Sequence, residues 1–125
     1  MFGFNSQSTI DTGKQAENMA ARYLRSQGLK VVDRNYSCKG GEIDLICNHH
    51  DTLVFVEVRH RQQNHYGSGA DTVSAAKQKK IIVAAKTYLQ QHYGNRPPAC
   101  RFDVISTTGE KYQIDWLQNA FGVYS

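Results

Sequence analysis

Two acidic residues near the middle of the chain are the first candidates for chemistry. Asp44 lies in the run GEIDLI and Glu57 in the run VFVEV, and Arg59 shares a strand face with Glu57 because strand side chains alternate. Two carboxylates held close together repel each other unless a cation lies between them, and Mg²⁺ prefers oxygen ligands. A metal ion polarises phosphate, and a basic group stabilises charge in the transition state. The set therefore indicates metal-assisted hydrolysis of a phosphodiester.

A β-hairpin is predicted to bring these side chains together. Residues 42–47 and 53–59 are rich in Ile, Leu, Val and Phe, and the polar residues 48–52 between them predict a loop longer than two residues. Antiparallel pairing places the open ends of both strands side by side, so the three charged groups should converge. A solvated hairpin edge with an ordinary cross-strand ion pair is the alternative. Alternation places Ile43, Leu45 and Cys47 on one face, and Val54, Val56 and Val58 on the core face.

Helices and further strands flank the hairpin in the sequence. A helix is predicted from about residues 11–13 to Gly28, which suits a C-terminal cap, and residues 1–11 are predicted to be a flexible tail. Ser74 is predicted to cap a second helix that ends near His92. Residues 62–70 are predicted to form a loop, and residues 29–36, 101–106 and 112–117 are predicted strands. This order predicts one α/β domain, residues 12–125, with a mixed central sheet flanked by helices.

The hairpin motifs also support a family resemblance. GEIDLI followed by VFVEV and a basic residue resembles the PD-(D/E)xK nuclease superfamily, and more closely the small bacterial YraN family, which looks like Holliday-junction resolvases. The resemblance covers residues 13–121 and implies a restriction-endonuclease-like αβββαβ core. Its other matching positions are Gly13, Glu17, Ala20-Ala21-Arg22-Tyr23-Leu24, Gly28, Arg34-Asn35-Tyr36, Lys77-Gln78, Ala84-Ala85, Tyr88-Leu89 and Arg101-Phe102-Asp103-Val104.

The resemblance implies that Asp44 and Glu57 bind Mg²⁺ or Mn²⁺, with Glu17 contributing from the first helix. The superfamily motif has Lys where this chain has Arg59. A lysine can be tuned to exchange a proton, whereas arginine stays protonated and supplies only charge and hydrogen bonds. Three alternatives follow: Arg59 contacts the scissile phosphate and substitutes in part, catalysis is weak or lost, or a lysine such as Lys77 or Lys80 takes the role.

Basic residues near the predicted site indicate a nucleic-acid partner. The chain has a net charge of +4, and Arg61 follows the second strand of the hairpin. Cations at a helix start oppose the helix dipole, but they are favoured if phosphates bind there. Branched or structured DNA is the expected substrate, RNA is an alternative, and a homodimer is expected by analogy with resolvases. The predicted nucleic-acid contacts on the second helix are Lys77, Gln78, Lys79 and Lys80.

Composition narrows the setting and leaves three classes of function. The three cysteines lack metal-site spacing, which indicates a reducing, cytoplasmic location. No apolar run approaches the ~20 residues that span a bilayer, and no secretory signal is recognised. The leading interpretation is an endonuclease-like enzyme. The others are a nucleic-acid-binding module that has lost catalysis and a protein-interaction domain, which would show no salt-dependent DNA binding.

Overall fold

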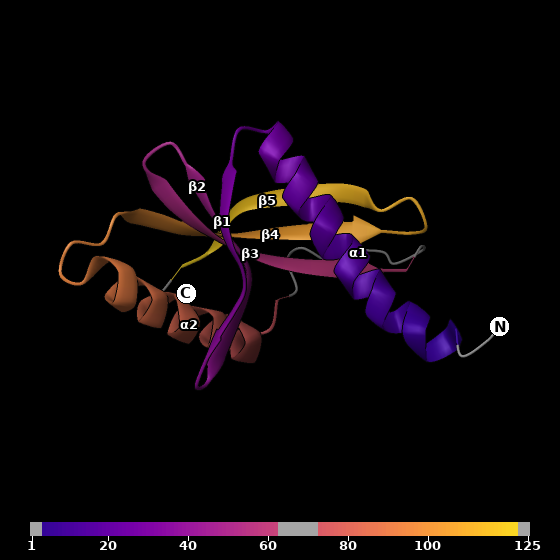
Figure 1. Cartoon of the computed structure of the whole chain (residues 1–125), viewed down its shortest axis with the longest axis horizontal. Helices are drawn as coiled ribbons and strands as arrows, with labels where there is room; N and C mark the ends of the chain where they lie inside the picture. The colour runs from indigo at the N-terminus through magenta and orange to yellow at the C-terminus, as the bar shows by residue number, and fades with distance from the viewer. Residues whose placement is uncertain (1–3, 63–72, 123–125) are drawn as a thin grey trace.

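The chain folds into one α/β domain with a mixed five-stranded sheet (Figure 1). The structure is a computed structural model that describes residues 4–62 and 73–122, with side chains described from residue 12. Its elements are α1 (Phe4–Ser26), β1 (Lys30–Cys38), β2 (Gly41–His49), β3 (Thr52–Arg61), α2 (Ala75–Tyr93), β4 (Ala99–Thr108) and β5 (Gln113–Phe121). The strand order β1-β2-β3-β4-β5 follows the chain, with β3 and β4 parallel and the other neighbours antiparallel. The predicted fold class is confirmed.

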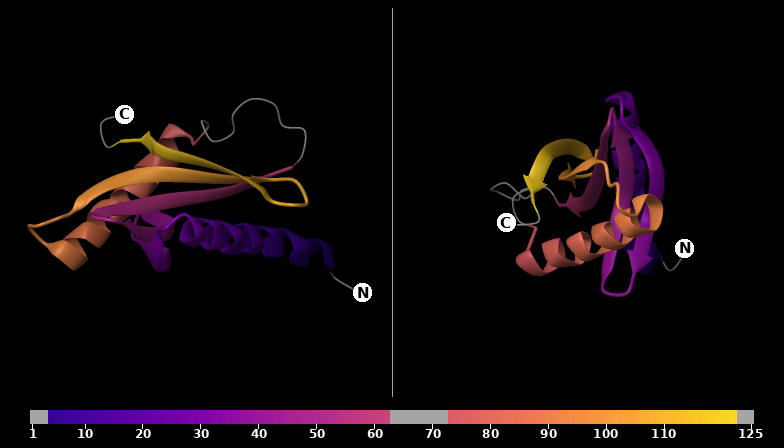
Figure 2. Two further views of the ribbon diagram at one scale, coloured as in Figure 1. Left: turned by 90° about the horizontal axis from the view of Figure 1, so that it is seen from above. Right: turned by 90° about the vertical axis from the view of Figure 1, so that its left-hand side faces the viewer.

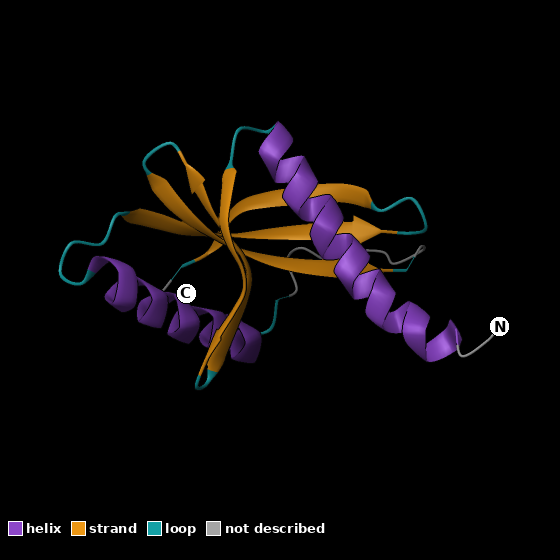
Figure 3. Ribbon diagram, viewed as in Figure 1, coloured by secondary structure: helices purple, strands orange, loops and turns teal. Residues whose placement is uncertain are grey.

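Helices cover both faces of the sheet, which explains why β3 is apolar on both sides. The two helices pack against different faces of the strands (Figures 2 and 3). On the face of α1, the core includes Ala20, Leu24, Leu45, Val54, Val56 and Ile105. On the face of α2, it includes Ile46, Phe55, Ile81, Ala85, Tyr88 and Phe102. Alternate residues of β3 thus enter two different clusters, and the predicted core role of Val54 and Val56 is confirmed.

Helix α1 is longer than the sequence pattern indicates. It begins at Phe4 rather than at residues 11–13, so the predicted start was wrong. The stretch before residue 11 contains no proline that would stop a helix. The predicted end is confirmed, because Gly28 has φ 93° and its N–H donates to the carbonyl oxygen of Arg25 at 3.1 Å. The mobility of residues 1–11 stays a prediction.

The loop between β2 and β3 is shorter than predicted. His49 pairs with Thr52, so only His50 and Asp51 form the turn. His50 has φ 57°, a left-handed conformation that tight hairpin turns require and that histidine tolerates better than most residues. The prediction of a longer loop was therefore wrong because the polar run itself continues the strands.

The tip of the β1–β2 hairpin leaves β3 at Asp44 and extends beside α2 (Figure 1). Main-chain pairing between β2 and β3 starts at Leu45 and Val56, whereas β1 and β2 stay paired as far as Cys38 and Gly41. Freed from β3, the strand bends, and Ile43 joins the core cluster of α2. Ile43 thus packs on the side of α2, whereas Leu45, with which it was predicted to share a strand face, packs on the side of α1. The bend places Asp44 at the fork between the two strand pairs.

Gly41→Ala is expected to destabilise the protein by about 1–3 kcal/mol through overpacking. A Cβ atom at this position would overlap the carbonyl oxygen of Lys80 and lie 2.8 Å from the backbone nitrogen of Ala84. Urea unfolding measures the loss. The matched control is Gly13→Ala in α1, where no atom lies within 4 Å of the added Cβ. That change should be neutral or slightly stabilising, and equal effects of both changes would contradict the packing argument.

The second half of the chain largely follows the prediction. Ser74 caps α2, since its side chain accepts the N–H of Lys77 at 3.1 Å. Strand β4 extends the predicted strand at both ends, and β5 runs on to Phe121, past a bulge opposite Phe102 and Val104. Most of the predicted loop at residues 62–70 lies outside the described residues.

Candidate active site

Asp44 and Glu57 converge at the fork where β2 leaves β3, as predicted. The Oδ2 atom of Asp44 accepts the backbone N–H of Val58 at 2.8 Å, which replaces a main-chain partner at the end of the ladder. The side chains of Asp44 and Glu57 are also hydrogen-bonded to each other. Glu57 has only 11% of its side chain exposed. The hairpin therefore holds two carboxyl groups together in a partly buried position.

Burial and mutual repulsion keep a proton between these two groups. Burial and the neighbouring Asp44 carboxylate together raise the pKa of Glu57 to about 8, against the opposing effect of Lys77 and Arg59. Burial also raises the pKa of Asp44, although the Val58 N–H stabilises its charged form. A hydrogen bond between two carboxyl groups requires one proton. Near neutral pH the Glu57 carboxyl group of the metal-free protein is thus largely protonated.

Lys77 enters the site from the first turn of α2. Its Nζ atom lies 3.7 Å from Oε2 of Glu57 and 3.4 Å from Oε2 of Glu42. Burial alone would lower the pKa of Lys77, but the charges of Glu57, Glu42 and Asp44 together raise it. Lys77 is therefore an ammonium group at neutral pH.

Glu17 faces the same region from α1 but is paired with basic and amide groups. Its Oε1 atom accepts Nη2 of Arg34 at 2.7 Å and Nδ2 of Asn35 at 3.2 Å. A hollow of about 380 Å³ lies between α1 and β3, lined by Gly13, Lys14, Glu17, Asn35, Asp44 and Val58. Glu17 and Asp44 thus border one space, which a ligand could enter.

Sequence reasoning missed three polar residues around this hollow and a second hollow that shares Asn35 and Asp44 with it. Lys14 lies one helical turn before Glu17, Asn35 has φ 52°, and Glu42 contacts Lys77. A second hollow of about 220 Å³, beside the β1–β2 hairpin, includes Asn35, Glu42 and Asp44. Helical spacing from Glu17 would have identified Lys14. No sequence signal identifies the other two, because their positions depend on the bend in β2.

Arg59 and Arg61 continue along β3 on the face of Glu57. Arg59 pairs in register with Ser106 of the parallel strand β4, and Arg61 pairs with Thr108. Nε of Arg61 and Oγ of Ser106 are buried, and neither atom has a hydrogen-bond partner within the described part of the chain. The convergence of Arg59 on the site is supported by its effect on Glu57. Ser106 was not predicted from the sequence.

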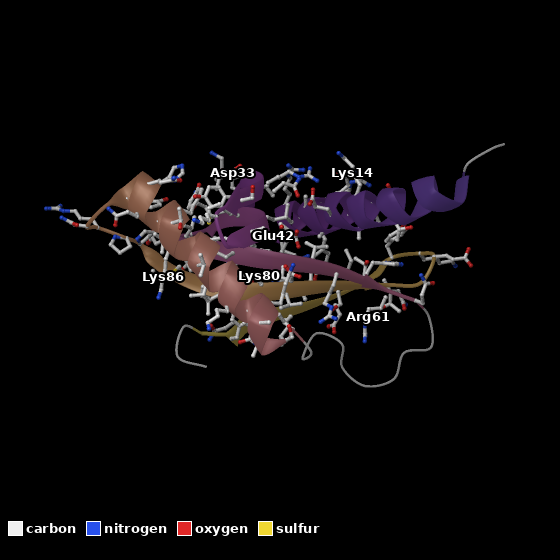
Figure 4. All side chains as sticks on the ribbon, turned by 90° about the horizontal axis from the view of Figure 1, so that it is seen from below. Lys14, Asp33, Glu42, Arg61, Lys80 and Lys86 are labelled. Carbon is white, nitrogen blue, oxygen red and sulfur yellow. The ribbon has the colours of Figure 1, made fainter. Side chains whose placement is uncertain are left out.

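The remaining predicted contacts on α2 have different environments. Gln78 is engaged by the chain itself, since its Nε2 atom donates to the carbonyl oxygen of Val73 at 2.9 Å. Lys79 and Lys80 are exposed to solvent. Figure 4 shows Lys80 on α2 near the hairpin that carries Glu42, with Lys86 farther along the helix. Of the residues predicted on α2, Lys77 is thus the one that contacts the carboxyl groups.

The carboxyl pair fits a hard divalent cation. Its donors are oxygens, and a cation could replace the proton that now lies between them. Across residues 12–62 and 73–122, no three His, Cys, Asp or Glu side chains form a group that could hold a metal ion. Mg²⁺ or Mn²⁺ at Asp44 and Glu57 would therefore complete its coordination with water and phosphate oxygens. Direct ligation by Glu17 stays a prediction.

A second buried carboxylate, Asp103 on β4, has a different environment. It accepts hydrogen bonds from Nε of Arg101 at 3.0 Å, from Nε1 of Trp116 at 2.9 Å and from the backbone N–H of Asn119 at 2.9 Å. Nη2 of Arg101 also lies 3.1 Å from Nδ1 of His49. Asp103 is completely buried. Because its oxygens are fully used within the protein, this cluster links β2, β4 and β5 and offers no open site.

Comparisons with known proteins match most of the chain to one family. The sequence model described as "Uncharacterised protein family UPF0102" matches residues 16–107. A UPF0102 protein from Aeromonas hydrophila subsp. hydrophila is 52% identical over 115 residues, covering 91% of this chain and 87% of that protein. A UPF0102 protein from Nitrosococcus oceani is 46% identical over 117 residues, covering 92% and 94%. No helix within the described residues is long and apolar enough to cross a membrane.

Proposed function

The chain belongs to the UPF0102 family of YraN-like proteins, and we propose that it hydrolyses phosphodiester bonds in DNA with a divalent cation. The observation that supports this function is the partly buried Asp44–Glu57 pair, in which Glu57 has a raised pKa and Asp44 borders an open hollow. A carboxyl pair that serves only structure has little need to keep both groups in a position where they repel. Such perturbed groups in a cleft are typical of catalytic sites.

Each residue of the site has a defined task in this proposal. Asp44 and Glu57 would hold Mg²⁺ or Mn²⁺, which polarises phosphate and lowers the pKa of bound water. Hydrolysis adds a water oxygen to phosphorus and breaks one phosphorus–oxygen ester bond, and the leaving oxygen takes up a proton. The Val58 N–H fixes the orientation of Asp44, and Arg59 supplies positive charge beside Glu57. Glu17 would orient water at the edge of the hollow.

The nucleic acid would extend from the carboxyl groups over the N-terminal half of α2. Lys79 and Lys80 are exposed there and can bind flanking phosphates, and Arg61 can do so along β3. Gln78 is less suited to bind phosphate, because its amide group already donates a hydrogen bond to the carbonyl oxygen of Val73. The preferred substrate in this proposal is branched or structured DNA, with RNA as the alternative. A homodimer and a cytoplasmic location complete the proposal, and the free thiols of Cys38, Cys47 and Cys100 suit a reducing compartment.

A second candidate is a nucleic-acid-binding module with weak or lost catalysis. Arg59 favours this function, since it cannot exchange a proton as the lysine of the superfamily motif can. The module would bind DNA with an affinity that falls steeply with salt, as phosphate contacts require, but would not cleave it. The two candidates thus differ in turnover rather than in binding.

Asp44→Asn is expected to lower metal-dependent DNA cleavage more than about 100-fold. The amide retains an acceptor for the Val58 N–H but removes the negative charge that attracts the cation. The measurement is cleavage of labelled four-way junction, flap, single-stranded and duplex DNA with Mg²⁺ or Mn²⁺. The matched control is Asp51→Asn, an exposed residue at the other end of the same hairpin. Binding without cleavage by the wild-type protein would favour the second candidate, and equal cleavage by both variants would reject the site.

A further inference from the structure

Lys77 lies beside the carboxyl pair of the candidate active site. Its ammonium group lies 3.7 Å from Glu57 and 3.4 Å from Glu42, so it approaches the carboxyl pair from the side of α2. Both distances exceed the ~2.8 Å of a tight charged hydrogen bond. About a third of the side chain, 34%, is exposed. Lys77 is therefore close to the site without being locked to either carboxylate.

The start of α2 holds the backbone of Lys77 in place. The Ser74 side chain accepts the Lys77 N–H at 3.1 Å, and Gln78 binds back to Val73. The same helix turn packs against the β1–β2 hairpin, where Gly41 lies against the backbone of Lys80 and Ala84. These contacts fix the point from which the Lys77 side chain reaches the carboxyl groups. The flexible end of the side chain remains able to move between partners.

Lys79 and Lys80 do not share this geometry. Both are exposed, and the backbone of Lys80 faces the hairpin while its side chain is in solvent. On a helix, Lys79 points away from Lys77, whereas Lys80 lies on the same side about one turn farther along the axis. Among the lysines of α2, the described contacts thus assign only Lys77 to the carboxyl groups.

We propose that Lys77 is a catalytic residue that contacts the scissile phosphate and takes the role that a lysine two residues after Glu57 would have. The inference rests on the proposed hydrolysis of DNA and identifies the positively charged side chain that acts beside the metal-binding carboxyl groups. When phosphate enters, the ammonium group exchanges Glu57 and Glu42 for a non-bridging phosphate oxygen. It stabilises the charge that builds up there as water attacks phosphorus. Lys77 keeps its proton throughout, so the step needs no further acid or base from this residue.

The proposal also explains how the chain can tolerate Arg59. Arg59 stays on β3 and contributes charge near Glu57, whereas the movable ammonium group comes from α2. The site then has two cations on two elements. Moving the lysine back to β3 should therefore compensate for its loss from α2.

The test uses the full chain in four forms: wild type, Lys77→Ala, Lys77→Ala combined with Arg59→Lys, and Lys86→Ala. Lys86 is an exposed lysine of the same helix and serves as the matched control. Cleavage of labelled DNA is measured with Mg²⁺ or Mn²⁺. Binding is measured with Ca²⁺ in place of these ions, over a series of salt concentrations. Thermal melting confirms that each variant is folded.

Lys77→Ala is expected to lower the cleavage rate about 100-fold or more, and the double variant should regain at least tenfold of that loss. Lys86→Ala should cleave like the wild type. Cleavage by Lys77→Ala within threefold of the wild type overturns the proposal. If the wild type cleaves no DNA, the proposed hydrolysis is rejected. The salt dependence of DNA binding then tests whether Lys77 contacts a phosphate. The slope of the logarithm of the binding constant against the logarithm of salt concentration is compared among the variants. A slope reduced by about one for Lys77→Ala alone supports the phosphate contact, and an unchanged slope rejects it.

Discussion

Glu57→Gln is expected to raise the unfolding free energy of the metal-free protein at pH 9 by a few kcal/mol while abolishing metal-dependent cleavage. The pKa of Glu57 is about 8 in the folded protein, against 4.5 for an ordinary glutamate. Between these pH values the folded state holds a proton that the unfolded chain has released. The unfolding free energy therefore falls as pH rises from 4.5 to 8, and above 8 the full loss applies. Glutamine has no proton to release, so the variant avoids this loss.

Urea unfolding with a chelator between pH 5 and pH 9 measures this effect as the difference between the wild type and Glu57→Gln. Each pKa unit corresponds to about 1.4 kcal/mol, which makes the expected gain large for a single substitution. Glu110→Gln is the matched control, because Glu110 is exposed in the turn after β4. Parallel pH profiles for the wild type and Glu57→Gln would contradict the assignment of the shared proton. Added Mg²⁺ should stabilise the wild type but not Glu57→Gln.

Asp103→Ala is expected to have the opposite effect on stability, a loss of about 3–5 kcal/mol. The substitution removes the acceptor of Arg101, Trp116 and the Asn119 N–H, and these donors would stay inside the protein without it. Arg101 has only 17% of its side chain exposed, so its charge would be left largely buried. Urea unfolding at constant pH measures the loss.

Asp115→Ala is the matched control for Asp103→Ala, because Asp115 lies on β5 and is exposed. It should change the unfolding free energy by no more than about 0.5 kcal/mol. Cleavage per folded molecule should be unaffected by Asp103→Ala, since this cluster links strands away from the Asp44–Glu57 pair. A loss below 1 kcal/mol would show that Asp103 is not a main link between β4 and β5.

Local sequence patterns predicted the hairpin, the two helices and the convergence of Asp44 with Glu57. These features depend on alternation along single strands and on caps such as Ser74 and Gly28, which are short-range signals. The partner of Glu17 could not be predicted in the same way. Arg34 reaches it from β1, and that contact exists only after α1 has packed across the sheet.

The positions of Lys77 and Asp103 required the three-dimensional fold for a similar reason. Sequence spacing left Lys77 and Lys80 as equal candidates, and the bend of β2 at Asp44 decides which of them meets the carboxyl groups. Asp103 was visible only as part of a family match, and its donors come from β4 and β5 across a bulge. Tertiary contacts of this kind leave no periodic trace in the sequence.

The hydrogen bond from the Val58 N–H to Asp44 has a consequence for how such a protein could evolve. A descendant that lost catalysis would still need an acceptor at position 44 to close the end of the β2–β3 ladder. The described interactions of the Glu57 carboxyl group are with the side chains of Asp44, Lys77 and Arg59, so position 57 would be released from that need. In a relative with altered residues here, drift at position 57 would therefore indicate lost activity earlier than drift at position 44. An aspartate retained at position 44 would say more about the architecture than about catalysis.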